Sequence, residues 1–215
     1  MKKILFILLF ISFGVIVAQE NKPFSVFNIG FYGGINFYNT ENIKGDFLVE
    51  LKANLISSFK LKASCGFFRT IEPYSYTVRK YSENIIDTLP KFFATKYNLV
   101  SKNYDIFPLT LGIQYLIVNS IFSPYLSVDA VYNFMNTFIE TSPSEVWSYN
   151  SIDEIPDEFK ENQKEEELPN NSYGIILGAG TTYHISSKLN LDIRYFFKYD
   201  SKIVNMHHII IGVYF

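Results

Sequence analysis

Apolar and polar residues alternate along most of this chain, and the alternation begins near residue 24. In the first such stretch Phe27, Ile29 and Phe31 occupy odd positions, and Asn28 and Gly30 lie between them. Successive side chains of a β-strand point to opposite faces, so this period of two predicts strands and an all-β fold. The pattern recurs in eight stretches: 24–38, 46–55, 59–67, 107–117, 122–134, 173–184, 189–198 and 208–215.

One region offers a helical alternative. The 23 residues from 106 to 128 carry no charged side chain, which is long enough for a membrane-spanning helix. Pro108 and Pro124 argue against a helix, because proline removes a backbone donor and clashes with the preceding turn. Asn119 and Ser120 form a turn signal between two alternating runs. We therefore interpret this region as two strands joined by a tight turn.

The connections between the predicted strands have two lengths. Short ones at 57–58, 119–120 and 186–188 follow the second, fourth and sixth strands, whereas those at about 70–103 and 139–172 are long. Short turns at one end, long loops at the other and an even strand number are typical of membrane barrels. The sequence predicts an eight-stranded antiparallel up-and-down transmembrane β-barrel. We expect both termini at the short-turn end and the two long connections to be external loops.

The two faces of the predicted strands differ in chemistry. The apolar face suits lipid, and the polar face suits a barrel interior. A soluble lipocalin-like barrel would reverse the faces, and strand length, the loop asymmetry and the terminal Phe215 favour the membrane form. Charges confined inside a barrel should be paired. We expect an interior charge network in which the acids Glu50, Asp129 and Asp192 neutralise some of the bases Lys52, Lys62 and Arg194.

The N-terminus has the features of a targeting segment. Lys2 and Lys3 precede an apolar run of about 15 residues that ends at Ala18, and polar residues follow at once. A positive start, an apolar middle and a small residue at the exit describe a cleaved secretory signal peptide. The run is short for a spanning helix, which makes an uncleaved anchor the weaker alternative. We predict a signal peptide at 1–18 and an outer-membrane barrel domain at 19–215.

Composition narrows the function classes. Aromatic residues make up 18% of the chain, which is too much apolar surface for a disordered protein. The net charge of −2 argues against a nucleic-acid binder. Cys65 is the single cysteine, so an intramolecular disulfide framework and a cysteine-rich zinc site are excluded. We expect no nucleic-acid partner.

The C-terminus carries a resemblance to a known family. The ending from Ile209 to Phe215 is an amphipathic strand that closes on an aromatic residue, similar to the assembly signal of bacterial outer-membrane proteins. The strands around Gly178 and Leu189 resemble those of the small barrels that include OmpX and the OmpA barrel, and also the PorT-like barrels. The resemblance implies location in the outer membrane of a Gram-negative bacterium and insertion by the barrel assembly machinery, with Tyr214 and Phe215 as the C-terminal signal. It carries over no catalytic residue.

Candidate catalytic and metal-binding residues are few. His184 and Ser186 have the spacing of the pair in lipid A deacylase barrels, which they resemble, but they fall beside a short turn, whereas that enzyme works at the outer leaflet. His207 and His208 are neighbours on one strand, so they point to opposite faces and cannot bind one ion from inside. Cys65 is expected to face lipid. We expect no catalytic residue, no cofactor and no metal site.

The long connection at 139–172 is the most distinctive surface segment. It holds ten acids and two lysines. Such a segment is either a solvated loop, partly helical or disordered, or a surface that binds cations or a partner. It lacks the spacing of a calcium-binding loop.

These features predict a non-enzymatic outer-membrane protein with a structural or surface-interaction role, in contact with outer-membrane lipid. The alternatives are a narrow solute pore, a secretion-apparatus subunit and, with least support, a lipid-modifying enzyme. The inward aromatics oppose the pore, because eight strands leave little lumen. Those aromatics are Tyr32, Tyr125, Phe196 and Tyr214.

Overall fold

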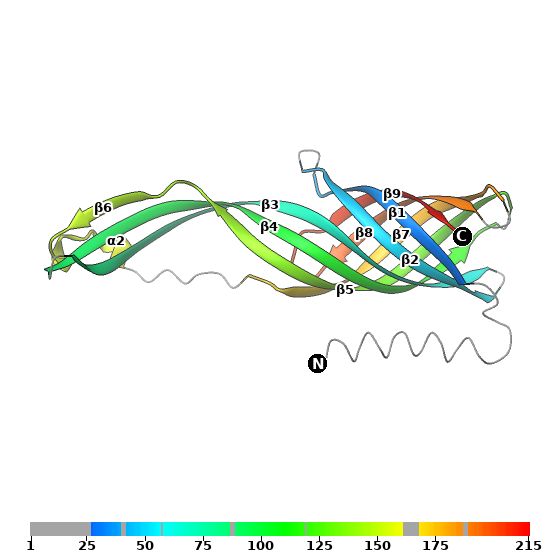
Figure 1. The fold of residues 1–215 in the computed structure, drawn as a ribbon, viewed down its shortest axis with the longest axis horizontal. Helices are drawn as coiled ribbons and strands as arrows, with labels where there is room; N and C mark the ends of the chain where they lie inside the picture. The colour runs from blue at the N-terminus through cyan, green and yellow to red at the C-terminus, as the bar shows by residue number, and fades with distance from the viewer. Residues whose placement is uncertain are drawn as a thin grey trace. The chain divides into compact units, whose positions relative to one another are not determined.

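The computed structural model describes residues 27–39, 42–56, 58–86, 89–118, 120–160, 168–186 and 189–215. The predicted signal peptide lies outside the described residues. The elements are β1 (Phe27–Phe37), β2 (Lys44–Ile56), β3 (Phe59–Ile86), β4 (Leu89–Leu116), β5 (Phe122–Thr141), β6 (Glu145–Tyr149), η1 (Ile152–Glu154), α2 (Asp157–Lys160), β7 (Asn171–His184), β8 (Asn190–Asp200) and β9 (Met206–Tyr214), as Figure 1 shows.

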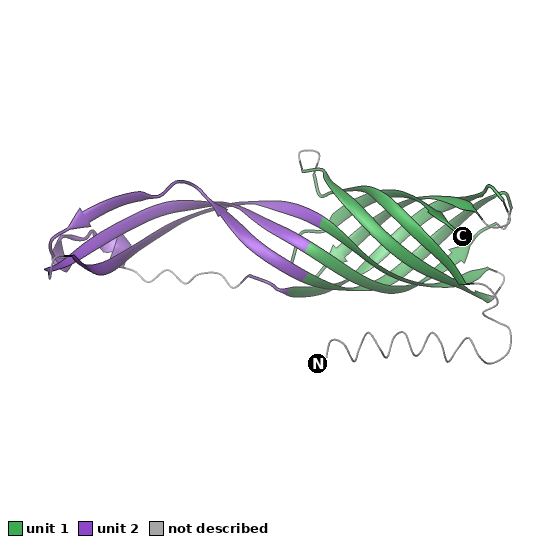
Figure 2. Cartoon of the chain, in the orientation of Figure 1, with its two compact units in different colours: residues 1–68, 106–134, 171–215 green, residues 69–105, 135–170 purple. Residues whose placement is uncertain are grey.

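The chain divides into two compact units, which Figure 2 shows in different colours. The first, here called the barrel unit, contains residues 1–68, 106–134 and 171–215. The second, here called the hairpin unit, contains residues 69–105 and 135–170. Strands β3, β4 and β5 contribute residues to both units.

The barrel unit is a closed antiparallel sheet. Its strands pair in the order β3-β2-β1-β9-β8-β7-β5-β4, and the additional pairing of β3 with β4 closes the ring. The first and last strands are neighbours, and Ile29 and Phe215 exchange two backbone hydrogen bonds of 3.1 and 3.0 Å. Closure leaves no unpaired edge, which is the condition for a sheet to cross lipid. The predicted eight-stranded barrel is confirmed.

The outward face of the barrel is apolar and accessible, as the alternation predicted. Large aliphatic and aromatic side chains cover it on every strand, for example Phe31 47%, Leu51 47%, Ile113 47%, Val128 56%, Leu177 53%, Ile193 46% and Ile211 51% exposed. A soluble protein does not present a continuous apolar surface of this kind to water. The barrel is therefore of the membrane-spanning type, and the lipocalin-like alternative is wrong.

Glycines on the inward face make room for tyrosine rings. A Cβ placed on Gly180 would lie 2.6 Å from Cζ of Tyr125, and one on Gly30 would lie 2.7 Å from Cε2 of Tyr32. Both tyrosines are almost completely buried. A narrow barrel is filled by alternating small and large inward residues, so these pairings pack the lumen.

The hairpin unit contains strands within residues 70–103, which the sequence predicted only as a long external loop. Strands β3 and β4 continue through it, and β6 pairs with β4 from Phe92↔Tyr149 to Lys96↔Glu145. Ala94, Ile155 and Phe159 form a small buried core against Phe92 and Tyr149. The described part of 139–172 holds β6, η1 and α2 in addition. Among the described residues, no helix is long and apolar enough to cross a membrane.

A charge on the outward face should destabilise the barrel strongly. For Ile211→Arg we expect a loss of about 2–4 kcal/mol in the free energy of unfolding in lipid vesicles, because an arginine facing hydrocarbon is costly. Ile152→Arg is the matched control, since Ile152 is 43% exposed in the hairpin unit and Ile211 is 51% exposed on the barrel. Denaturant unfolding followed by fluorescence measures both, and equal losses would contradict the lipid-facing assignment.

Candidate functional site: the ion network inside the barrel

The six residues predicted as an interior charge network lie on inward positions of four strands. Glu50 and Lys52 come from β2, Lys62 from β3, Asp129 from β5, and Asp192 and Arg194 from β8. All six are buried, at 5% exposure or less. The structure brings them together in the middle of the barrel, although Arg194 is 144 residues from Glu50 in sequence.

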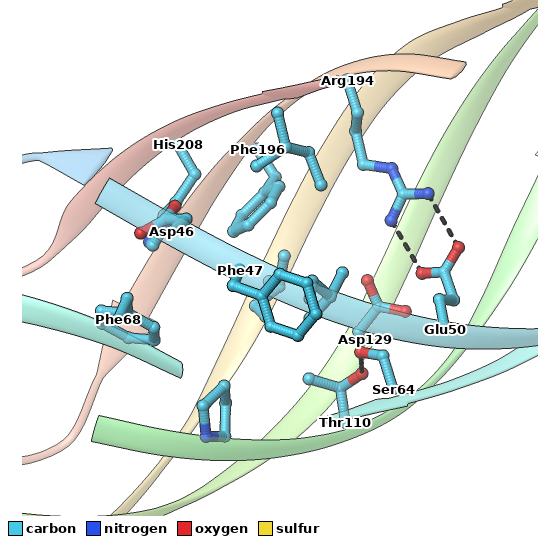
Figure 3. Close-up of a pocket in the computed structure, with 14 residues that line it drawn as sticks. Asp46, Phe47, Glu50, Ser64, Phe68, Thr110, Asp129, Arg194, Phe196 and His208 are labelled. Carbon is cyan, nitrogen blue, oxygen red and sulfur yellow. Dashed lines mark hydrogen bonds and ion pairs between the residues drawn. The ribbon is translucent and has the colours of Figure 1, made fainter. Parts of the chain in front are cut away.

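The Arg194–Glu50 pair is the centre of the network. Arg194 donates from Nη1 to Oε2 of Glu50 and from Nη2 to Oε1, both at 2.8 Å, as Figure 3 shows. Such a bidentate pair uses both carboxylate oxygens and the planar guanidinium, which fixes the orientation of both groups. Arg194 Nε also donates to the hydroxyl of Tyr125 at 2.8 Å. The pair therefore joins β2 to β8, three strands away in the ring.

Lys52 and Lys62 each have an acid other than Glu50 as the nearest partner, and longer contacts of 3.3 to 3.9 Å link both lysines to Glu50 and Arg194 to Asp192. Lys52 lies 2.7 Å from Oδ2 of Asp192, and the tyrosine hydroxyls of Tyr125 and Tyr32 donate to the same carboxylate at 2.5 and 3.3 Å. Lys62 lies 2.9 Å from Oδ2 of Asp129. The three acids and three bases sum to zero, so the centre of the lumen carries no net charge. A neutral, tyrosine-lined network fills the space through which a solute would pass.

Two further inward residues, His208 and Lys198, make polar contacts that the sequence did not predict. His208 Nδ1 is 2.6 Å from Oδ2 of Asp46, and its ring stacks on Phe196 with centroids 4.3 Å apart. Lys198 contacts Asp200 at 3.3 Å and donates to Asn133 at 3.1 Å. The alternation places these residues inward, but it gives no information on which strand faces which across the lumen. Their pairing depends on the stagger of the closed barrel.

The histidines have structural partners. Among the described contacts, His184 lies between Ser123 Oγ at 3.2 Å and Asn190 Oδ1 at 2.5 Å, and no contact joins it to Ser186. Ser123 is completely buried, so this serine–histidine–asparagine group joins β5, β7 and β8 beside the turns and offers no access to a lipid ester. His207 points outward and its Nδ1 lies 2.8 Å from the hydroxyl of Tyr195.

The structure also shows the surroundings of the remaining candidate residues. Within the described part of the chain, no group of three or more histidine, cysteine or acidic side chains is arranged to hold a metal ion. Cys65 is a free, exposed thiol on the outward face of β3. Tyr214 is buried with Lys52 Nζ 4.4 Å from its ring centre, whereas Phe215 is 53% exposed. The role of Tyr214 and Phe215 as an assembly signal stays a prediction.

The acidic segment is only partly described. Glu140, Glu145, Asp153, Glu154, Asp157 and Glu158 belong to the described residues, and Glu161, Glu165, Glu166 and Glu167 lie outside them. Arg79 lies 3.3 Å from Glu158, and Lys160 lies 3.2 Å from Asp157. Elsewhere in the hairpin unit, Arg69 and Asp105 form an exposed pair at 2.5 Å, and this hydrogen bond raises the pKa of Arg69.

Comparison with solved structures gives the class of the fold. Neisserial surface protein A (NspA) has a TM-score of 0.50 at 12% identity, with 87% of this chain and 95% of that chain covered. The chain has the fold of the small outer-membrane β-barrels. The N-terminal β-barrel domain of Pseudomonas aeruginosa OprF has a TM-score of 0.44 at 12% identity over 88% and 95% of the two chains. Ail of Yersinia pestis has 0.42 at 14% over 88% and 96%. No protein-family model and no curated protein matches the sequence.

For this small outer-membrane barrel, breaking the central pair should be costly. We expect Arg194→Met to lower the free energy of unfolding by about 3–5 kcal/mol, because it leaves the buried Glu50 carboxylate without its main partner. The double change Arg194→Met with Glu50→Leu should recover much of the loss. The exposed pair supplies the control, since Arg69→Met should cost about 1 kcal/mol or less. Denaturant titration in vesicles measures all three, and an Arg194→Met loss no larger than that of Arg69→Met would contradict the network.

Proposed function

We propose that this chain is a bacterial outer-membrane protein whose closed barrel serves as a membrane anchor and whose hairpin unit carries a surface-interaction role, without catalysis or transport. The observation that carries the proposal is the packed lumen. Lys52, Asp192 and Arg194 are each 3% exposed or less, and Tyr32 and Tyr125 are buried beside them. A barrel whose centre is filled by neutral, hydrogen-bonded groups is suited to stability in the membrane and poorly suited to conduction.

The hairpin unit supports the interaction role. It exposes large apolar side chains outside its small core: Ile85 78%, Leu89 67%, Val146 56%, Phe138 44% and Ile152 43%. Exposed apolar groups at this density favour contact with a partner. Asp153, Glu154, Asp157 and Glu158, the described acids after β6, lie in the same unit, so the partner would meet apolar and acidic groups together.

Ser123 is buried beside His184, so this serine–histidine pair gives no support to the lipid-modifying enzyme. The buried ion network disfavours the narrow pore, because its side chains occupy the lumen. A secretion-apparatus subunit, which the PorT-like resemblance implied, is a special case of the interaction role and would co-purify with other subunits after mild crosslinking. No observation in the described structure favours it specifically.

A conductance measurement distinguishes a closed membrane anchor from a solute pore. We expect the purified, folded chain to give no steady unitary currents in planar bilayers, because the ion network closes the lumen. A bacterial porin in the same lipid is the positive control. Regular unitary currents that persist after removal of contaminating porins would overturn the proposal.

Orientation is tested separately by thiol labelling in a Cys65→Ser background. We expect Ser82→Cys, exposed in the hairpin unit, to react with a membrane-impermeant maleimide on intact cells. Ser186→Cys is the matched control, exposed beside a short turn, and should react only after the outer membrane is permeabilised. Labelling of Ser186→Cys on intact cells, with Ser82→Cys protected, would reverse the assigned orientation.

A further inference from the structure

The sheet of the hairpin unit ends on a strand with one open edge. Strand β6 is the last strand in the order of the sheet, and within the described residues it pairs with β4 alone, from Lys96↔Glu145 to Phe92↔Tyr149. Alternate N–H and C=O groups of an edge strand point away from its neighbour, so those of β6 have no described strand to receive them. Such an edge is a template for another extended segment.

The side chains of β6 are accessible. The first four residues of the strand are exposed and Tyr149 is half-buried. The ring of Trp147 packs against that of Phe159, with centres 5.7 Å apart, and Trp147 still keeps 40% of its surface exposed. Strand β6 is therefore held in place by its own unit and remains accessible to a partner.

The other open edge of this sheet is protected, whereas the edge of β6 is not. The pairing of β2 with β3 ends at Asp46↔Phe68, so β3 beyond this point pairs with β4 alone among the described strands. That part of β3 contains Pro73 and Lys80, and proline and lysine on an edge oppose the addition of a further strand. Strand β6 contains neither residue type, and it is rich in residues that favour strands: Val146, Trp147 and Tyr149.

The charge around β6 selects the partner. Residues 140–160, which include β6, η1 and α2, hold six acids and one lysine. Acids lie at both ends of the strand, because Glu145 is its first residue and the Glu154 carboxylate accepts the backbone N–H of Asn150 at 3.1 Å just after its last. Lys96 lies opposite Glu145, whereas Glu154 forms no ion pair with a described base. A basic segment is attracted to this edge, and a second copy of the chain would bring the same acids to it.

We propose that the open edge of β6 binds a basic, extended peptide segment of a partner protein, which adds to the sheet as a further strand. Main-chain hydrogen bonds to β6 supply affinity, and lysine or arginine side chains near Glu145 and Glu154 supply selectivity. The exposed ring of Trp147 offers a cation a further contact. This inference rests on the proposed surface-interaction role of the hairpin unit and names the chemistry of its partner.

The test uses Trp147, the single tryptophan of the chain, which lies at the centre of β6. The full chain is folded in micelles of an uncharged detergent and titrated with a short capped peptide in which lysine alternates with threonine. We expect a saturable change in the emission of Trp147 and slower hydrogen exchange of the β6 amides. The absence of both changes would overturn the proposal. An emission that changes with the concentration of the chain alone would assign the edge to a second copy and would also overturn it.

Two altered peptides separate the contribution of the backbone from that of the charge. Methylation of the backbone nitrogens keeps the charge and removes the donors, and glutamate in place of lysine keeps the backbone and reverses the charge. We expect each altered peptide to bind about tenfold more weakly or worse, because each lacks one of the two sources of affinity. Equal binding of the methylated peptide contradicts strand addition, and equal binding of the acidic peptide contradicts a basic partner.

Variants of the chain locate the site. Val146→Lys places a charge that repels the peptide on the open edge, and we expect it to weaken binding by about tenfold or more. Ser82→Lys adds the same charge to an exposed position of β3 in the same unit and should bind within about twofold of the parent. Glu154→Gln keeps an acceptor for Asn150 and should weaken binding about two- to fivefold, whereas Glu83→Gln, an exposed acid of β3, should not.

Failure of this inference and failure of the proposed function give different results. Heat-modifiable gel migration and an unchanged emission of Trp147 before titration establish that each variant is folded. If folded Val146→Lys and Ser82→Lys then bind the peptide equally, the hairpin unit binds it elsewhere and only this inference is overturned. If thiol labelling places the hairpin unit on the inner side of the outer membrane, the surface role fails, whereas the titration in micelles still decides whether β6 accepts a basic strand.

Discussion

The structure depends on one constraint: in lipid, each backbone N–H and C=O must find its partner within the protein. A sheet meets this condition only when it closes, and here β3 pairs with β4 and β1 pairs with β9 to leave no edge. Closure then determines the chemistry of the two faces. One side of each strand meets hydrocarbon and is apolar, and the other meets a narrow space that eight strands enclose. The alternation visible in the sequence is the consequence of that division.

The narrow interior explains why the buried charged side chains of the network lie next to groups of opposite charge. A charge there has little water around it, so its partner must come from another inward position of the barrel, as Glu50 of β2 does for Arg194 of β8 at 2.8 Å. Pairing of this kind requires the correct strand stagger, because a slip of one residue turns each inward side chain to the outside. Replacing a buried ion network with apolar groups is often neutral or stabilising, so burial of the network is not by itself a source of stability, whereas loss of one partner leaves an uncompensated charge.

Much of the barrel could be predicted because lipid imposes a one-sided pattern on each strand. Glu50 and Arg194 were placed inward by alternation alone. Their contact with each other was not, since they are 144 residues apart and only the closed barrel determines which walls meet. The same holds for Asp46 and His208, 162 residues apart. The strands of the hairpin unit could not be predicted, because lipid imposes no one-sided pattern on them. Tyr76 and Tyr81 are exposed there without a lipid face, so no consistent alternation marks the strand.

Exposed apolar side chains therefore have different explanations in the two units. In the barrel unit, exposed apolar residues such as Leu177 are satisfied by lipid and require no partner. In the hairpin unit, the same exposure at Ile85 is an unsatisfied apolar surface, because the small core of Ala94, Ile155 and Phe159 does not cover it. The meaning of an exposed apolar side chain thus depends on the solvent that its unit meets. For this reason we place the proposed interaction role on the hairpin unit rather than on the more apolar barrel.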